Sequence, residues 1–192
     1  MINKEELRKT LQRRLNNEDC EKIIEELLSQ NFDMLYLYEL SFNGKHPEDF
    51  HSCWLIEKIQ RKNPVILDII IASLLKDFSR IENNSSMRIY AKMISNAFLL
   101  YKKNKASEKL IYAIENADKT ILIEGCFNFL LNEKTRIATK IWLIQILINF
   151  VKENNWIYEE LIHITYDLIN SKTPAGRNFG KRFLNELRSL NI

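Results

Sequence analysis

Glycine and proline are scarce in this chain of 192 residues, with 4 and 3 copies respectively. A β-rich fold needs many tight turns, and turns use these two residues, so their scarcity disfavours that class. Disorder is disfavoured as well, because 46% of the residues are hydrophobic. We therefore expect one helical domain over residues 1–192, which is long enough to bury a core without disulfides or metals.

Cysteine is also sparse, and Cys20, Cys53 and Cys126 lie far apart in an odd number. They form no CxxC pair and no disulfide framework, so reduced thiols are expected. Residues 1–6 lack the apolar stretch of a signal peptide. These features together predict a cytoplasmic protein.

The longest apolar run covers residues 141–151, and only Gln145 and Asn149 interrupt it. This run is too short for a membrane span and is flanked by Lys140 and Lys152, so no membrane partner is expected. A helix that is apolar on nearly every side must be covered by neighbours on several faces. We therefore predict that the run forms the central helix of a stack of helices.

Helix-start signals recur along the rest of the chain, notably Pro47 and Pro64, which we place at the first position of a helix. Short connections should fold successive helices back into antiparallel hairpins. Residues 1–45 are expected to form N-terminal capping helices, and residues 171–192 a C-terminal capping helix. Residues 46–170 are expected to form three hairpins, which pair 46–62 with 64–78, 84–105 with 107–132, and 133–152 with 156–169.

The periodicity also predicts which side chains are buried. In the helix over 46–62, Cys53 and Ile59 belong to the inner face, whereas Glu57 and Lys58 should face solvent. In the segment 107–132, which can break near residues 116–118, Leu131 is expected inside. Each of these positions tests whether helical spacing alone identifies the core.

A helix–turn–helix unit that recurs about every 40–50 residues is typical of HEAT and armadillo arrays. In the first and third hairpins, Asn63 and Asn154 occupy equivalent turn positions. We therefore predict an all-α fold, an α-α superhelix (HEAT/armadillo-like solenoid) of about nine or ten helices.

Two segments carry a resemblance to a known family. Residues 52–59 combine Trp54 with an apolar helix that is followed by Asn63-Pro64, and residues 173–182 bring Pro, Gly and Arg into the final helix. In order and spacing this pattern resembles a family of small bacterial HEAT-like repeat proteins of unknown function. The resemblance covers most of residues 40–190. It implies a HEAT-like fold and no established activity.

Some members of that family are labelled adenylosuccinate lyases. The signature loop of the lyase superfamily begins Gly-Ser-Ser, whereas this chain has Asn84-Ser85-Ser86-Met87, and it is shorter than a lyase subunit. A motif match requires its structural context, so lyase activity is not expected.

The titratable residues predict no catalytic or metal site. His46, His51 and His163 are dispersed, and the adjacent carboxylates Glu159 and Glu160 diverge on a helix. We therefore predict that the protein is not an enzyme and has no cofactor or metal.

Charge is unevenly distributed along the chain. Residues 1–60 carry 8 Lys/Arg against 12 Asp/Glu, whereas residues 171–192 carry 5 against 1. A basic end can attract an anionic partner, although the same pattern can simply favour solubility. The possible partner-binding residues are Lys102, Lys103, Lys105, Arg177, Lys181 and Arg182.

Stacked helix pairs leave an extended groove that binds peptides or proteins without catalytic groups. We therefore predict a non-catalytic helical-repeat scaffold with a protein or peptide partner. The alternative is a HEAT-like protein that binds nucleic acid through basic residues of the groove and of the C-terminal helix. HEAT-like repeats also form DNA-base excision enzymes, but Trp54 and Trp142 fall on apolar faces where core packing is the default, so glycosylase activity is not expected.

Overall fold

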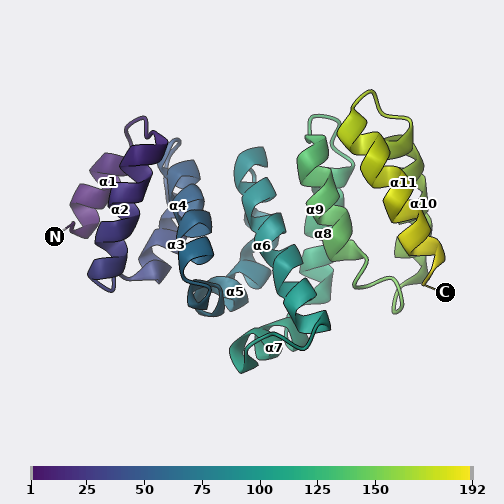
Figure 1. Cartoon of the computed structure of the whole chain (residues 1–192), viewed down its shortest axis with the longest axis horizontal. Helices are drawn as coiled ribbons and strands as arrows, with labels where there is room; N and C mark the ends of the chain where they lie inside the picture. Colours follow the sequence, from purple (N-terminus) through teal and green to yellow (C-terminus); the bar gives the residue numbers. More distant parts are fainter. Residues whose placement is uncertain (1, 191–192) are drawn as a thin grey trace.

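The computed structural model describes residues 2–190, and this part of the chain is all-helical, with eleven α-helices and no strand. The prediction of an all-α fold is confirmed, with eleven helices rather than nine or ten. Figure 1 shows the helices following one another in approximate chain order from one end of the molecule to the other. They are α1 (Lys4–Leu11), α2 (Asn17–Ser29), α3 (Met34–Asn43), α4 (Glu48–Lys62), α5 (Val65–Asp77), α6 (Asn84–Lys102), α7 (Glu108–Glu115), α8 (Lys119–Leu130), α9 (Ile137–Leu147), α10 (Asn155–Ile169) and α11 (Pro174–Arg188), with a short 3-10 helix η1 (Phe78–Arg80) after α5.

Polar side chains set many of the helix starts. Asn3 and Asn16 each accept a backbone N–H three residues on, at 2.9 Å, and each completes a capping box. Asp118 caps α8 in a similar way and separates it from α7, which explains the break expected near residues 116–118. Pro47 and Pro64 stand one residue before the first helical residue rather than at the first helical position.

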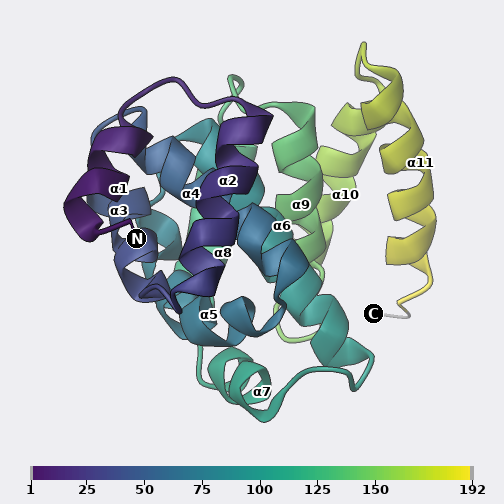
Figure 2. The same cartoon turned by 60° about the vertical axis from the view of Figure 1, so that its left-hand side comes forward.

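Neighbours in sequence are not always the closest neighbours in space. The most extensive packing joins α3 with α4, α10 with α11, and α6 with α9, a pair visible side by side in Figure 2. The predicted third hairpin would have packed α9 mainly on the helix that follows it, but among the described residues α9 contacts α6, α8 and α11 more than α10. The reason is that α9 is apolar on several faces, so it is covered by helices from different parts of the chain.

The burial predicted for the run 141–151 is confirmed for most of its residues. Leu143 and Leu147 of α9 are fully buried, and the turn that follows buries Phe150 and Val151. Ile141 and Trp142 of the same run are partly buried against the core.

The helix itself is shorter than the predicted span 133–152. Asn149 Nδ2 donates to the carbonyls of Gln145 at 3.0 Å and Ile146 at 2.7 Å, so a side chain satisfies carbonyls that would otherwise be free at the helix end. The two polar residues of the run therefore have different roles. Asn149 caps the end of α9, and Gln145 accepts a hydrogen bond from Ser95 of α6 at 3.2 Å.

Two predicted faces are wrong. Glu57, expected in solvent, is only 7% exposed, because α4 packs on α6 and brings Lys92 Nζ to 2.8 Å from its carboxylate. Lys58, also expected in solvent, has a side chain that is only 18% exposed, because it pairs with Glu21 of α2 at 2.9 Å. Leu131, expected inside, is 70% exposed, because α8 ends at Leu130 and the next residue turns away from the core.

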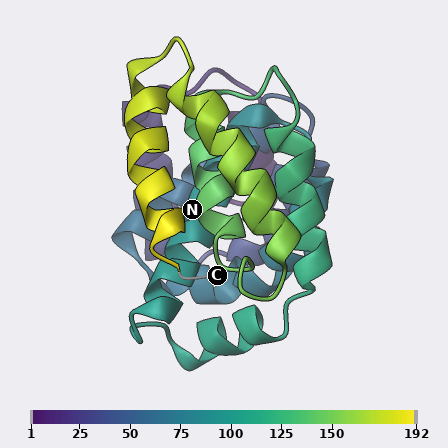
Figure 3. The same cartoon turned by 90° about the vertical axis from the view of Figure 1, so that its right-hand side faces the viewer.

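The last two helices approach each other closely at Gly180. A Cβ at this position would lie 2.8 Å from Cγ1 and 3.0 Å from the backbone nitrogen of Ile169, where α10 ends. Figure 3 shows α11 lying alongside α10. Within residues 2–190, no helix is both long enough and apolar enough to cross a membrane.

Candidate functional site

The six basic residues predicted from the sequence fall in two groups, one at the end of α6 and one on α11. From the first group, Lys102 lines a hollow of about 340 Å³ together with Trp142 of α9 and Glu186 of α11. Partial burial lowers the pKa of Lys102, while Glu186 acts in the opposite direction. Lys102 therefore shares this hollow with a carboxylate of α11. Lys103 and Lys105 are exposed in the turn that follows.

Two of the basic residues on α11 make contacts within their own part of the chain. Arg177 Nη1 donates to the carbonyls of Ser171 at 3.0 Å and Lys172 at 2.9 Å, which stabilises the turn before α11. The guanidinium of Arg182 lies 5.7 Å from the ring centre of Phe179, and Lys181 is exposed. Binding of a partner through these six residues stays a prediction.

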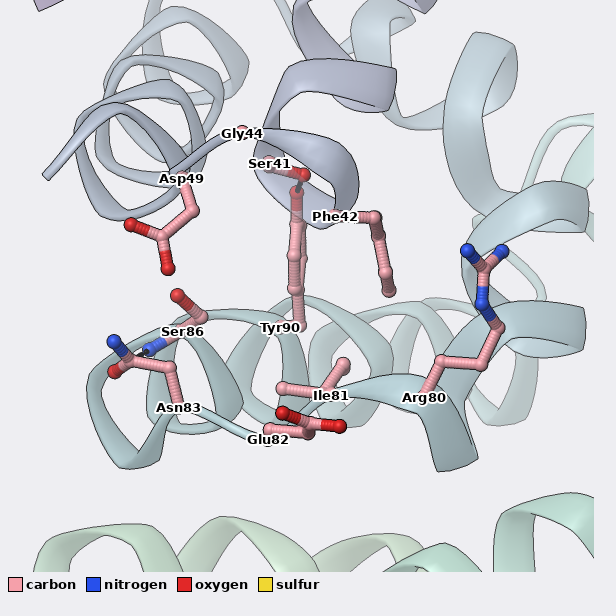
Figure 4. Close-up of a pocket in the computed structure, with 10 residues that line it drawn as sticks. All are labelled: Ser41, Phe42, Gly44, Asp49, Arg80, Ile81, Glu82, Asn83, Ser86 and Tyr90. Atoms are coloured by element: carbon pink, nitrogen blue, oxygen red, sulfur yellow. Dashed lines mark hydrogen bonds between the residues drawn. The ribbon is translucent and has the colours of Figure 1, made fainter. Parts of the chain in front are cut away.

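A polar pocket of about 590 Å³ lies where α6 begins, next to the end of α3 and the first turn of α4 (Figure 4). We call it the α6 N-terminal pocket. Asn83 caps α6, because its Oδ1 accepts hydrogen bonds from the backbone N–H groups of Ser85 at 2.8 Å and Ser86 at 3.4 Å. The pocket is lined by Ser41, Phe42, Gly44, Asp49, Arg80, Ile81, Glu82, Asn83, Ser86 and Tyr90.

One wall of this pocket is formed by two stacked aromatic rings, one of which hydrogen-bonds a serine. The Tyr90 ring is fully buried and stacks on Phe42 with 5.7 Å between ring centres. Its hydroxyl hydrogen-bonds Ser41 Oγ, which in turn donates to the carbonyl of Tyr38 at 2.6 Å. Burial raises the pKa of Tyr90 well above its usual value, so this hydroxyl stays protonated and the wall is uncharged.

The charges around the pocket are predominantly negative. Asp49 is mostly buried and lies 3.3 Å from His46 Nδ1, and Glu82 is exposed without an ion pair within residues 2–190. Arg80 is already paired, because its Nη1 lies 2.9 Å from Asp77 Oδ1. The pocket thus offers acceptor oxygens more than free cations.

Ser86 is the unusual member of this lining. Its side chain is 3% exposed, yet its hydroxyl oxygen has no hydrogen-bond partner in the described part of the chain. The neighbouring Cys53 thiol, a weak donor, is directed at the Ser86 carbonyl at 3.9 Å. Most buried side-chain polar atoms have a partner, so this oxygen needs an explanation.

A second hollow, of about 630 Å³, lies between α8 and the first turns of α10. We call it the Trp156 hollow. Trp156 is 50% exposed and lies against Phe127, with 5.2 Å between ring centres, and Leu131 stands in solvent beside it. Glu124 and Glu160 are exposed in the same lining. This hollow was not expected from the sequence, because helical spacing placed Leu131 in the core.

The cysteines are all free and buried. Burial raises the pKa of the Cys20 thiol to about 11 and raises the pKa values of Cys53 and Cys126 further. Because the thiolate is the reactive form, these side chains are poor nucleophiles near neutral pH. Over residues 2–190, no group of three or more His, Cys, Asp or Glu side chains could hold a metal ion.

Comparison of the chain with models of protein families, with curated proteins and with solved structures gives no match. The HEAT-like resemblance of residues 40–190 therefore stays a prediction.

Proposed function

We propose that this protein is a non-catalytic, HEAT-like helical scaffold that binds a protein partner in the Trp156 hollow. The progression of the helices from one end of the molecule to the other is compatible with a solenoid. The observation that carries the binding proposal is the half-exposed Trp156, which stands beside the exposed Leu131.

Large apolar side chains in solvent are costly, and covering them with a partner is favourable. Tryptophan is among the residues that contribute most to protein interfaces, since it buries a large area with few rotatable bonds. The Phe127 ring contacts the indole, with 5.2 Å between ring centres, and this contact helps to hold the indole in place before a partner arrives. A preorganised apolar surface loses little entropy when it binds.

The charges at the hollow indicate the chemistry of the partner. Glu124 and Glu160 are both exposed there and have no ion pair within residues 2–190. A partner segment with one large apolar side chain beside a lysine or arginine would complement both the ring and the carboxylates. We therefore propose a basic, apolar peptide segment as the ligand.

Selection of peptides from a random display library on the full chain tests this proposal. Enriched sequences should place Leu, Phe or Trp beside Lys or Arg. Trp156→Ala should weaken a selected peptide about tenfold or more, as expected for an interface hot spot. Tyr166→Ala is the matched control, because Tyr166 lies on the same helix and is 44% exposed but outside the hollow.

Failure to enrich any sequence would contradict peptide binding. Selected peptides that bind the Trp156→Ala variant as tightly as the unchanged protein would place the site elsewhere. Circular dichroism should show that both variants keep their helices.

The alternative function, nucleic-acid binding through the six basic residues, can be tested in parallel. If it holds, a mobility-shift titration should show an affinity that falls steeply as salt increases, because phosphate contacts release counterions. Substitution of Lys181 and Arg182 by Gln should then reduce the salt dependence. Absence of a shift at low salt would exclude this alternative.

A further inference from the structure

We propose that the α6 N-terminal pocket binds a small organic cation with N–H donors, namely an alkylammonium or guanidinium ion. This site lies among α3, α4 and α6, away from the Trp156 hollow, so it does not rest on the proposed function.

The buried hydroxyl of Ser86 has an unused capacity for hydrogen bonds within residues 2–190. Figure 4 shows this hydroxyl and the Asp49 carboxylate directed toward each other across the pocket. No hydrogen bond joins the two groups, and Ser86 Oγ has no other partner among the described residues. Both oxygens can accept, so one group with several N–H donors could satisfy them together.

The charges of the lining favour a ligand of positive charge. Asp49 and Glu82 contribute two carboxylates, whereas the charge of Arg80 is balanced by Asp77 at 2.9 Å. The beginning of a helix often binds anions, but here Asn83 already accepts the N–H groups of Ser85 and Ser86. An anion would therefore face carboxylates and find these donors occupied, which leaves a cation as the favoured ligand.

The volume and the aromatic lining of the pocket also suit a small organic cation. A volume of about 590 Å³ is within the range of small-molecule sites. The partly exposed Phe42 ring already lies against one organic cation, because the Arg80 guanidinium is 5.6 Å from its ring centre, whereas the Tyr90 ring is buried behind Phe42. Carboxylate, hydroxyl and aromatic groups together suit an ammonium or guanidinium ion better than a bare metal ion, which prefers several oxygen ligands.

The test is an NMR titration of the full-length protein with methylguanidinium chloride and with n-butylammonium chloride. Tetramethylammonium chloride is the control, since it has the same charge but no N–H donor. We expect saturable shifts of the backbone amides of Asp49, Asn83 and Ser86, with at least one N–H cation binding about fivefold more tightly than the control. The tighter of the two probes identifies the head group. Equal responses to all three salts, or no saturable shift, would overturn the proposal.

Charge variants test the sign independently. Asp49→Asn should weaken cation binding about tenfold and Glu82→Gln about twofold to threefold, since Glu82 is exposed to solvent. Arg80→Gln should strengthen it about twofold to threefold, because it removes a like charge. Glu133→Gln removes the same charge from an exposed residue outside the pocket and should change nothing. The opposite order, or binding of inorganic phosphate in place of the cations, would show an anion site.

Ser86→Ala separates a binding role from a structural one. We expect about fivefold weaker binding of the cation, with an unfolding midpoint in its absence that is unchanged or higher, because the deleted hydroxyl has no partner. A lower midpoint with unchanged binding would mean that Ser86 only supports the fold, and would contradict the proposal.

Discussion

The N-terminal part of the molecule, α1 to α6, and the C-terminal part, α8 to α11, are held together by different interactions. Both bury apolar side chains, but helices of the N-terminal part are also joined by ion pairs. Among the described residues 117–190, the ion pair is that of Lys119 with Glu153, and both side chains are exposed. The interhelical pairs of the N-terminal part include Arg8–Glu48 at 2.6 Å, Lys58–Glu21 at 2.9 Å and Lys92–Glu57 at 2.8 Å.

This difference shows which interactions fix the placement of the helices in each part. Glu48 is fully buried, so its carboxylate requires Arg8, and α1 must be placed where this pair can form. The C-terminal part instead depends on the fit of α9 and on the close approach at Gly180. The hollows follow the same division, since the α6 N-terminal pocket is polar and the Trp156 hollow is largely apolar.

The largest effect should come from the apolar centre. Leu147→Ala removes a fully buried side chain of α9, and we expect a loss of about 3 kcal/mol in the free energy of unfolding. Urea unfolding at low and high salt measures it, and the loss should not depend on salt. Leu131→Ala, at an exposed position, should change stability by less than about 0.5 kcal/mol. A strongly salt-dependent loss at Leu147 would break the comparison between the two parts.

An intermediate effect is expected at the contact between α10 and α11. Gly180→Ala would place a methyl group against the backbone of Ile169, and we expect a loss of about 1–3 kcal/mol. The matched variant Gly176→Ala would meet the hydroxyls of the partly exposed Ser171 and the exposed Thr173 rather than backbone atoms, so its loss should be smaller. Thermal unfolding of both variants measures the difference. Equal losses would mean that the close approach at Gly180 is not special.

The smallest loss of stability should come from removal of an ion pair. This loss should depend on pH. Burial alone would raise the pKa of Glu57, but hydrogen bonds from Lys92 and Arg61 outweigh it and lower the pKa. Hydrogen bonds from Lys62 and Lys58 lower the pKa of Glu21 from 4.5 to about 2. Carboxylates with a lowered folded-state pKa stabilise the protein above their unfolded pKa, and this stability is lost as the pH falls through the folded pKa.

We therefore expect stability to fall between about pH 4.5 and pH 2, where these carboxylates take up protons. Glu57→Gln should cost about 1 kcal/mol at neutral pH and should make the acid-induced loss shallower. Urea titrations over this pH range measure both effects. Lys119→Gln is the control, since its exposed pair should contribute little. An identical pH profile for the Glu57 variant would contradict the role of this pair.

Local signals accounted for much of the fold. Proline start signals and apolar spacing predicted helices over 46–62 and 64–78, close to the observed Glu48–Lys62 and Val65–Asp77, because these effects act within one or two turns. The same spacing failed at Glu57 and Leu131. Whether a side chain meets a partner or solvent there depends on another helix or on where its own helix ends.

By itself, the sequence determined that this chain is helical and that most of residues 141–151 are buried, because an apolar helix has to be covered. Only the tertiary structure decided that α9 packs on α6, and that Asp49, Ser86 and Tyr90 line one pocket. The physical reason is the separation in sequence over which each effect acts. Caps and periodicity depend on residues three or four positions apart, whereas a pocket depends on how distant helices share their covering surfaces.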